Sequence, residues 1–259
     1  MTRASSLRTI GWWLPTLVVA ALIAVPMVSV LWSLTQPDEA GWVHIRETLL
    51  TEYLLNTASL MLQVGVYTSL LGVGTAWLTA ATRFPGSRFF SWALMLPMAA
   101  PAYIVAYVYT DLLSFSGPVQ TLLRDGLGLG VDAFEFPEIR SLPGAALVIS
   151  IVLYPYIYLL ARVAFMQSSV KLFDAARTLG ASPWRAFLRI ALPAARPAIV
   201  GGLSLVLMET LADFGVVDYF GVPTFATGIF RTWFASGEKL AATKLAAVLF
   251  LFVIVLVVL

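Results

Sequence analysis

The 259-residue sequence is 60% hydrophobic and 12% charged, and its formal net charge is +2. Soluble domains carry about 25% charged residues, so this composition, with a mean hydropathy of +0.89, predicts an integral membrane protein. The absence of cysteine and the single histidine, His44, exclude disulfide frameworks and thiolate metal sites and argue against a histidine-based catalytic triad. The small net charge and the lack of a P-loop pattern indicate that the chain binds neither nucleic acid nor ATP itself.

Uncharged intervals indicate the membrane spans. Four of them reach the roughly 20 residues that a helix needs to cross the hydrocarbon core: residues 9–37, 53–82, 89–110 and 141–161. The length of the first favours an uncleaved anchor over a signal peptide. A fifth span is predicted at about 197–217, and a sixth begins near Lys244 and is cut short at Leu259. We therefore expect an all-α polytopic membrane helix bundle of about six transmembrane helices, the last apparently truncated.

Basic residues indicate the orientation of these spans. With the N-terminus in the cytoplasm, the inner segments hold ten Lys and Arg residues and one acid, Asp174, whereas the outer segments at 38–52 and 111–140 are acidic. An excess of Lys and Arg marks cytoplasmic loops. The sequence therefore predicts a cytoplasmic N-terminus.

A helix–glycine–helix elbow is predicted in the cytoplasmic segment 171–196. Lys171–Leu179 has good helix formers, Gly180 stands where a helix ends in the left-handed conformation, and Ser182 and Pro183 suit the N-cap and first position of a second helix. In that helix Pro193 is expected to be the end, with one apolar and one basic face, formed by Trp184, Phe187, Leu188 and Ala191 and by Arg185 and Arg189. One interpretation is a basic amphipathic helix that rests on anionic headgroups.

The spacing of this segment points to a second interpretation. Asp174-Ala175-Ala176, Gly180, Ile190 and Leu192-Pro193 together resemble the EAA motif of ABC importer permeases, with Asp174 in place of the usual Glu. In that family the elbow is the coupling helix, which docks into the cytoplasmic ATPase. The resemblance implies that residues 171–196 form an ATPase-coupling loop, that ATP binds to a partner subunit, and that this chain has no cofactor of its own.

Two further stretches resemble the ferric iron branch of these permeases. They are LPMAAPAYIVAYVYTDLLSFSGPVQ at 96–120 and METLADFGVVDYFGVPTFATGIFRTWF at 208–234, and Leu55-Asn56-Thr57 matches the start of the permease core. The resemblance covers the chain from about residue 50. In that branch two six-span units are usually fused, which implies that this chain is the N-terminal half of such a protein; a natural half-length subunit is the alternative.

Two acids interrupt the fifth predicted span. Glu209 and Asp213 are four residues apart and are expected on one helix face, where ionisable groups cost about 2.5–3.5 kcal/mol each on insertion scales. They either pin the helix, by pairing with an arginine or a backbone group or by staying protonated, or line a path for a hard cation such as ferric iron, which carboxylates suit. Tyr103 and Tyr107 belong either to this path or to an outer aromatic belt. No resident metal site is assigned.

The sequence thus predicts a transmembrane permease subunit of the bacterial inner membrane with the ABC importer permease fold. Residues 1–52 are expected to form an N-terminal transmembrane helix and outer loop, and residues 53–259 the core permease domain. The expected partners are cytoplasmic ABC ATPase subunits, a periplasmic substrate-binding protein, a second permease half or copy, and the lipid bilayer. The expected cargo is ferric iron; the alternatives are thiamine, a polyamine or an inorganic anion, or a secondary transporter driven by an ion gradient. A membrane enzyme is disfavoured because GxSxG and HExxH are absent.

Overall fold

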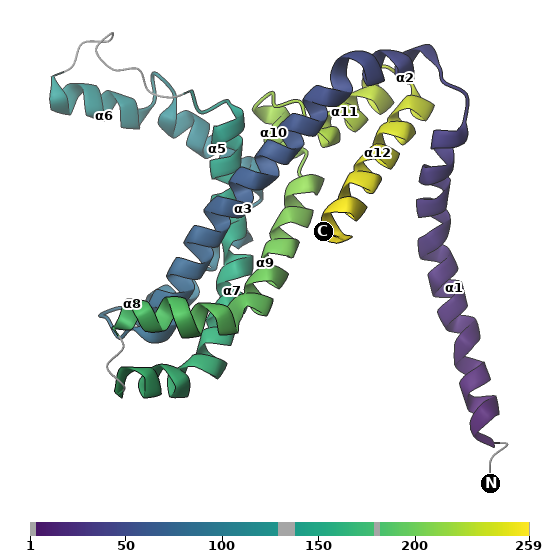
Figure 1. Ribbon diagram of the computed structural model, residues 1–259. Helices are drawn as coiled ribbons and strands as arrows, with labels where there is room; N and C mark the ends of the chain where they lie inside the picture. Colours follow the sequence, from purple (N-terminus) through teal and green to yellow (C-terminus); the bar gives the residue numbers. More distant parts are fainter. Residues whose placement is uncertain (1–3, 129–137, 179–181, 259) are drawn as a thin grey trace. The chain divides into compact units, whose positions relative to one another are not determined.

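Helices make up nearly all of the part of the chain that the structure describes (Figure 1). The computed structural model describes the backbone of residues 4–128, 138–178 and 182–258, with all side chains in these ranges except those of 4–12, 14, 168–178, 183 and 256–258. The α-helices are α1 (Ala4–Trp32), α2 (Ala40–His44), α3 (Leu50–Ala81), α4 (Ser87–Ala93), α5 (Ala102–Leu113), α6 (Pro118–Leu127), α7 (Leu142–Thr178), α8 (Pro183–Ala186), α9 (Leu192–Ala212), α10 (Gly215–Tyr219), α11 (Phe225–Phe230) and α12 (Lys239–Val258). The described residues contain no strand, as the sequence predicts.

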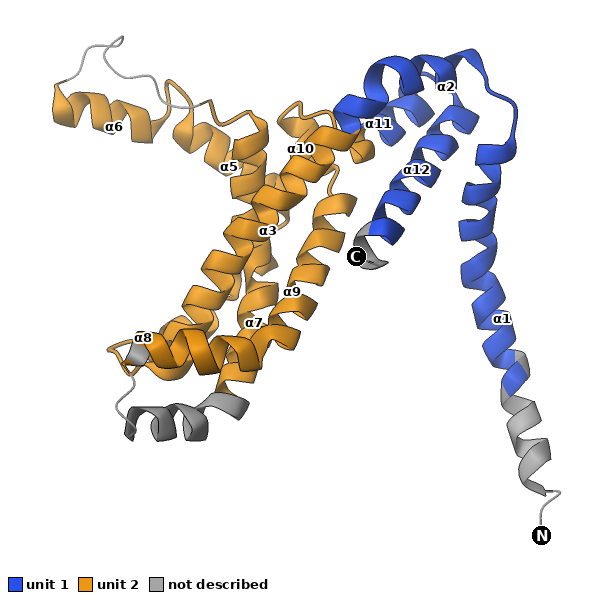
Figure 2. Cartoon of the chain, in the orientation of Figure 1, with its two compact units in different colours: residues 1–53, 228–259 blue, residues 54–227 orange. Residues whose placement is uncertain are grey.

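The helices form two compact units (Figure 2). Unit 1 comprises Met1–Tyr53 and Gly228–Leu259, and therefore holds α1, α2 and α12. Unit 2 comprises Leu54–Thr227, with most of α3 and all of α4 to α10. Each unit is treated by itself below.

Within the described ranges, four helices are long and apolar enough to cross a membrane. They cover Pro15–Thr35, Ala40–Ala81, Leu142–Gln167 and Trp184–Ala212, and a fifth span is obtained if the bent pair Ser87–Ala99 and Ala102–Leu127 is counted as one. The predicted third span at 89–110 is not one straight helix, because the two parts of this pair meet at 98°. The break falls at Pro101, which has no N–H for the helical ladder and disfavours the helical conformation of the residue before it; Ala100 is accordingly extended, with ψ 131°.

Pro193 does not end a helix, contrary to the prediction. One continuous helical segment runs from Pro183 to Ala212, with a π-helical turn at Phe187–Ala191. In a π-turn each N–H bonds to the carbonyl five residues back, and the Leu192 N–H accordingly donates to the Phe187 carbonyl. The following α-helical stretch begins with Pro193 in its first turn, where a proline N–H is not needed. The segment also stops five residues before the predicted end at 217.

Unit 2 is held together by close packing of α7 against α9 and α3. Ile157 of α7 is fully buried, and two glycines let the neighbouring helices reach it. A Cβ on Gly202 of α9 would lie 2.9 Å from the Ile157 Cα, and a Cβ on Gly72 of α3 would lie 2.8 Å from the Ile157 Cβ. Gly72 therefore lies at a close contact between helices, whereas Gly74, two residues further along α3, has no atom within 4 Å of its Cβ position.

Unit 1 contains a buried charge on α12. Lys244 is 1% exposed, and its Nζ donates to the carbonyls of Gln36 (2.8 Å) and Pro37 (3.3 Å) and to Oδ1 of Asp38 (2.6 Å). Asp38 Oδ2 accepts a second hydrogen bond from Arg46 at 3.1 Å. The hydrogen bond from Lys244 holds the pKa of the Asp38 carboxyl below its usual value. The junction between α1 and α2 is therefore fastened to α12.

Candidate functional site

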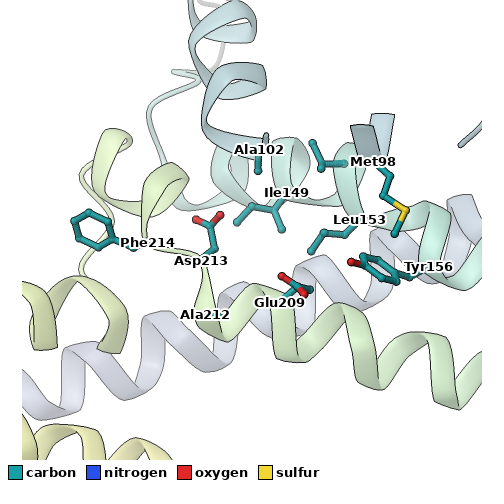
Figure 3. Close-up of a pocket in the computed structure, with 10 residues that line it drawn as sticks. Met98, Ala102, Ile149, Leu153, Tyr156, Glu209, Ala212, Asp213 and Phe214 are labelled. Atoms are coloured by element: carbon teal, nitrogen blue, oxygen red, sulfur yellow. The ribbon is translucent and has the colours of Figure 1, made fainter. Parts of the chain in front are cut away.

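A cavity of about 350 Å³ in unit 2 contains the two acids of the predicted path (Figure 3). It lies among the 3₁₀ turn Leu96–Ala99, the start of α5, the first half of α7 and the end of α9. Its lining residues are Met98, Ala102, Ile149, Val152, Leu153, Tyr156, Glu209, Ala212, Asp213 and Phe214. Segments that are more than 100 residues apart in sequence therefore build one site.

Glu209 and Asp213 meet at this cavity in different backbone settings. Glu209 lies in the last turn of α9, whereas Asp213 follows the helix in an extended conformation, with φ −68° and ψ 119°. The expectation that both acids share one helix face is wrong, because α9 ends at Ala212. Asp213 Oδ1 instead accepts hydrogen bonds from the N–H groups of Val216 (3.0 Å) and Val217 (3.4 Å), which satisfies donors at the start of α10.

The cavity is electrostatically one-sided. Its ten lining residues include two carboxylates and the phenol of Tyr156, but no Lys, Arg or His. Among the ion pairs of the described residues, none includes Glu209 or Asp213, and Glu209 is exposed. Two carboxylates without a compensating cation produce a negative potential that attracts a positively charged solute. The described ranges contain no cluster of three or more His, Asp or Glu residues that could hold a resident metal ion.

The predicted tyrosines lie beside this cavity and do not line it. The ring of Tyr107 packs on Tyr219 of α10, with centroids 4.0 Å apart. Tyr103 packs against α10 as well, since a Cβ placed on Gly215 would lie 3.0 Å from the Cβ of Tyr103. Both tyrosines are about half exposed, and the aromatic-belt interpretation of them stays a prediction.

Sequence reasoning missed Tyr156, the one phenol in the cavity wall. It lies on α7 in the stretch Tyr154-Pro155-Tyr156. A phenol beside a proline inside an otherwise apolar span was an available signal, because polar groups in spans normally face a cavity or a partner. That this residue lines the same cavity as Glu209 could not be deduced, since it depends on how α7 packs on α9.

The predicted coupling segment is only partly described. Asp174, Ala175 and Ala176 belong to the last turns of α7, but their side chains lie outside the described residues, and so does Gly180. Ser182 caps the next helix as predicted: its Oγ accepts a hydrogen bond from the Arg185 N–H at 3.4 Å and its carbonyl one from the Ala186 N–H at 3.0 Å. Ile190, Leu192 and Pro193 are half-buried.

One face of this second helix is anchored in unit 2. Phe187 and Ala191 are buried in a cluster with Phe165 and Trp77, and the Phe187 ring lies 4.7 Å from that of Trp77. Trp184 and Leu188, which were predicted on the same apolar face, are 66% and 43% exposed. The sequence pattern thus identified the anchoring pair, but the structure leaves the rest of the apolar face uncovered.

Comparison with known proteins gives the chain a family. Residues 69–259 match the sequence model of the binding-protein-dependent transport system inner membrane component. The molybdenum transport system permease protein ModB of Escherichia coli is 34% identical over 149 residues, 58% of this chain and 62% of that protein. The Fe(3+)-transport system permease protein FbpB 2 of Haemophilus influenzae is 27% identical over 250 residues, 95% of this chain but 44% of that protein. The chain thus spans about two thirds or less of the length of these relatives.

Solved structures have the same fold. A bacterial ABC transporter involved in the import of the acidic polysaccharide alginate matches with a TM-score of 0.73 and 20% identity, over 98% of this chain and 93% of that chain. The methionine ABC transporter MetNI matches with a TM-score of 0.57 and 18% identity, over 81% and 90%. The predicted ABC importer permease fold is confirmed. With the family match over residues 69–259, this assigns the chain to the binding-protein-dependent transport system inner membrane components, the multi-pass permease subunits of ABC importers.

Proposed function

We propose that this permease passes ferric iron from a periplasmic binding protein to the cytoplasm. The observation that supports this cargo is the acidic cavity, in which Glu209, Asp213 and Tyr156 offer only oxygen atoms and no basic side chain is present. Carboxylate and phenolate oxygens suit hard, highly charged cations better than soft metals. The FbpB 2 relative, which is named for Fe(3+) transport and aligns with 95% of this chain, supports the same cargo.

An inorganic oxyanion is the second candidate, favoured by the higher identity of ModB and by relatives named for sulfate and 2-aminoethylphosphonate transport. Oxyanions are usually held by backbone N–H groups or basic side chains. Beside this cavity, the N–H groups of Val216 and Val217 already donate to Asp213. The free carboxylate of Glu209 would repel an anion, so the wall chemistry favours the cation.

The energy for import is proposed to come from cytoplasmic ABC ATPase subunits, which bind the ATP. Their docking site is proposed at residues 171–196, with Asp174, Ala175, Ala176, Gly180, Ile190, Leu192 and Pro193 as the coupling residues. Phe187 supports this role, because its buried ring contacts Trp77 of α3. A displacement of the segment by the ATPase would therefore be transmitted directly to α3. A second permease half or copy is proposed to complete the path within the bilayer.

Uptake into proteoliposomes that contain the permease, its ATPase and its binding protein tests the cargo. Neutral amides at both acids, Glu209→Gln with Asp213→Asn, should lower iron uptake about tenfold or more, since two unit charges about 4 Å apart interact by about 4 kcal/mol at an effective dielectric constant of 20. Protein abundance, measured in parallel, should stay near the parental level, because Asn retains the oxygen that caps α10.

The matched control is Asp111→Asn, which neutralises an exposed acid of α5 that does not line the cavity. It should leave uptake unchanged. Iron import at the parental rate by a well-expressed double amide variant would contradict the carboxylate path. Uptake of molybdate or thiamine in place of iron by the parental protein would reject the cargo while leaving the permease assignment intact.

A further inference from the structure

The arginines of the chain differ in whether they have partners inside it. Three arginines of the predicted outer segments are satisfied internally: Arg46 pairs with Asp38 at 3.1 Å, Arg124 donates to the Phe115 carbonyl, and Arg140 donates to the Tyr219 carbonyl at 2.6 Å. On the predicted inner side, Arg83 and Arg88 have neither a hydrogen bond nor an ion pair from their guanidinium groups to any residue of the described ranges. Both side chains are exposed. This asymmetry points to an anionic partner outside the chain on the inner side.

A tight turn brings these two arginines to one place. The Ser87 N–H donates to the Phe84 carbonyl at 3.1 Å, and Gly86 has φ 86° and ψ 1°. Pro85 before this left-handed glycine gives the sequence signature of a type II turn, in which only Gly or Asn is readily accepted at the third position. Arg83 precedes the turn and Arg88 follows it in the first turn of α4, so a short, conformationally fixed connection holds two positive charges close together.

An exposed aromatic surface adjoins the two charges. Phe89, Phe90 and Trp92 of α4 are 55%, 46% and 49% exposed. Their rings contact one another edge to face, with centroids 5.6 Å apart for Phe89 and Phe90 and 5.4 Å apart for Phe89 and Trp92. Aromatic side chains at the level of lipid headgroups, next to Arg or Lys, are typical of membrane interfaces. The combination of cationic and apolar surface suits an amphiphile better than a free ion.

This surface is fixed to the core of unit 2. The hydroxyl of Tyr154 donates to the Leu94 carbonyl, and the hydroxyl of Tyr158 donates to the Ser91 carbonyl, each at 2.8 Å. Both tyrosines belong to α7, the helix that runs on into residues 171–178. Leu94, Met95 and Phe187 also share one apolar cluster. A molecule bound on α4 therefore lies at the end of unit 2 that also contains Phe187, in the helical segment after α7.

We propose that Arg83, Arg88 and the rings of Phe89, Phe90 and Trp92 form a binding site for an anionic phospholipid of the cytoplasmic leaflet. The phosphodiester oxygens accept hydrogen bonds from the two guanidinium groups, which match phosphate geometry. The upper part of an acyl chain covers the aromatic rings. The lipid thereby neutralises two charges that the described residues of the chain leave unpaired.

The test measures lipid selectivity of the membrane-embedded chain. The parental protein, in nanodiscs of phosphatidylglycerol and phosphatidylethanolamine, should retain phosphatidylglycerol preferentially when it is released for native mass spectrometry. Arg83→Gln with Arg88→Gln should weaken that retention about thirtyfold, given the usual contribution of each basic residue near an anionic surface. Arg124→Gln, which removes an arginine of α6, should leave it unchanged.

Three further arms decide between possible sources of the signal. The charge-conserving pair Arg83→Lys and Arg88→Lys should keep most of the selectivity, which separates loss of charge from misfolding. Trp92→Ala should weaken retention of the lipid while leaving its salt dependence intact. Displacement of phosphatidylglycerol by millimolar inorganic phosphate would overturn the proposal in favour of a free-anion site, and unchanged selectivity in the double Gln variant would overturn it outright. Loss of ATPase recruitment by the double Gln variant with unchanged lipid selectivity would identify a protein-docking surface instead.

Discussion

Asp213 serves the backbone as well as the cavity wall. One of its carboxylate oxygens accepts the N–H groups of Val216 and Val217, and both valines are fully buried. Replacing Asp213 by Ala should therefore lower the free energy of unfolding by about 1 kcal/mol, the usual cost of removing a cap, whereas Asp213→Asn should not. Apparent melting temperatures of the two variants in the same detergent check this. Equal destabilisation by Asn and Ala would show that the charge, and not the cap, is what stabilises α10.

Asp38 makes the stability of unit 1 sensitive to acid. Its pKa in the folded protein lies below the ordinary value of 3.8, chiefly because Lys244 donates a hydrogen bond to it. A carboxyl whose folded pKa is depressed contributes stability that is complete above the unfolded value and is lost as the pH falls through the folded value. The melting temperature of the parental protein should thus exceed that of Asp38→Asn at pH 7, and the gap should close as the pH falls below about 4. A gap that is constant between pH 7 and pH 3 would contradict the role of the charge.

Adjacent glycines on α9 allow a matched test of helix packing. A Cβ on Gly202 would lie 2.9 Å from the Ile157 Cα and 3.2 Å from the Tyr156 carbonyl oxygen, both backbone atoms, whereas a Cβ on Gly201 would meet nothing within 4 Å. Gly202→Ala should therefore destabilise the protein by about 1–3 kcal/mol through overpacking. Gly201→Ala should be neutral or stabilise it by up to about 1 kcal/mol, the gain in helix propensity. Thermal unfolding of both variants decides, and equal effects would exclude tight packing of α9 on α7.

The predicted elbow remains a prediction, and its test is functional. Gly180→Val should leave the protein in the membrane but separate ATP hydrolysis from import, because a β-branched residue resists the left-handed conformation that a tight break requires. ATPase recruitment, ATP hydrolysis and uptake should be measured on the same membranes. Normal uptake by the variant would remove the elbow from the mechanism.

The positions of the membrane helices could be predicted from the sequence where hydropathy alone determines them. They were harder to predict where a proline can break or bend a helix. The apolar intervals at 53–82 and 141–161 correspond to long helices, α3 and α7. Two prolines behave in opposite ways: Pro101 breaks the third span, whereas Pro193 is accommodated within a helix after a π-turn. Composition could not distinguish them, because the outcome depends on whether the preceding turn can shift its hydrogen-bond register. Pro155, inside the continuous helix α7, illustrates the same limit.

At the scale of the whole molecule, the absence of cysteine makes the predicted orientation directly testable. Thr82→Cys and Ser116→Cys introduce single thiols at exposed positions that the positive-inside rule assigns to opposite sides of the membrane. A membrane-impermeant maleimide should label residue 116 in intact spheroplasts and residue 82 only after permeabilisation. The reverse labelling pattern would invert the topology and the assignment of residues 171–196 to the cytoplasm.

The candidate site was predictable in its acids but not in its architecture. Glu209 and Asp213 are conspicuous because charge inside a span is costly, and both line the cavity. The two acids do lie near each other, but they do not share a helix face as predicted. The helix ends at Ala212, and Asp213 lies at the cavity wall because its carboxylate caps the start of α10. Tyr156 could not be assigned, because its place in the wall follows from the approach of α7 to α9 at Gly202.

The hydrogen bonds of Lys244 have a consequence for the order of events during synthesis and membrane insertion. Its three acceptors come from residues 36–38, more than 200 positions earlier in the chain, and they are therefore synthesised long before α12. Until the two segments meet, an ammonium on so apolar a helix has to remain at the headgroup level, where a flexible lysine can reach water. Unit 1 can therefore close around this contact only after α12 has been synthesised and inserted, however early α1 enters the membrane.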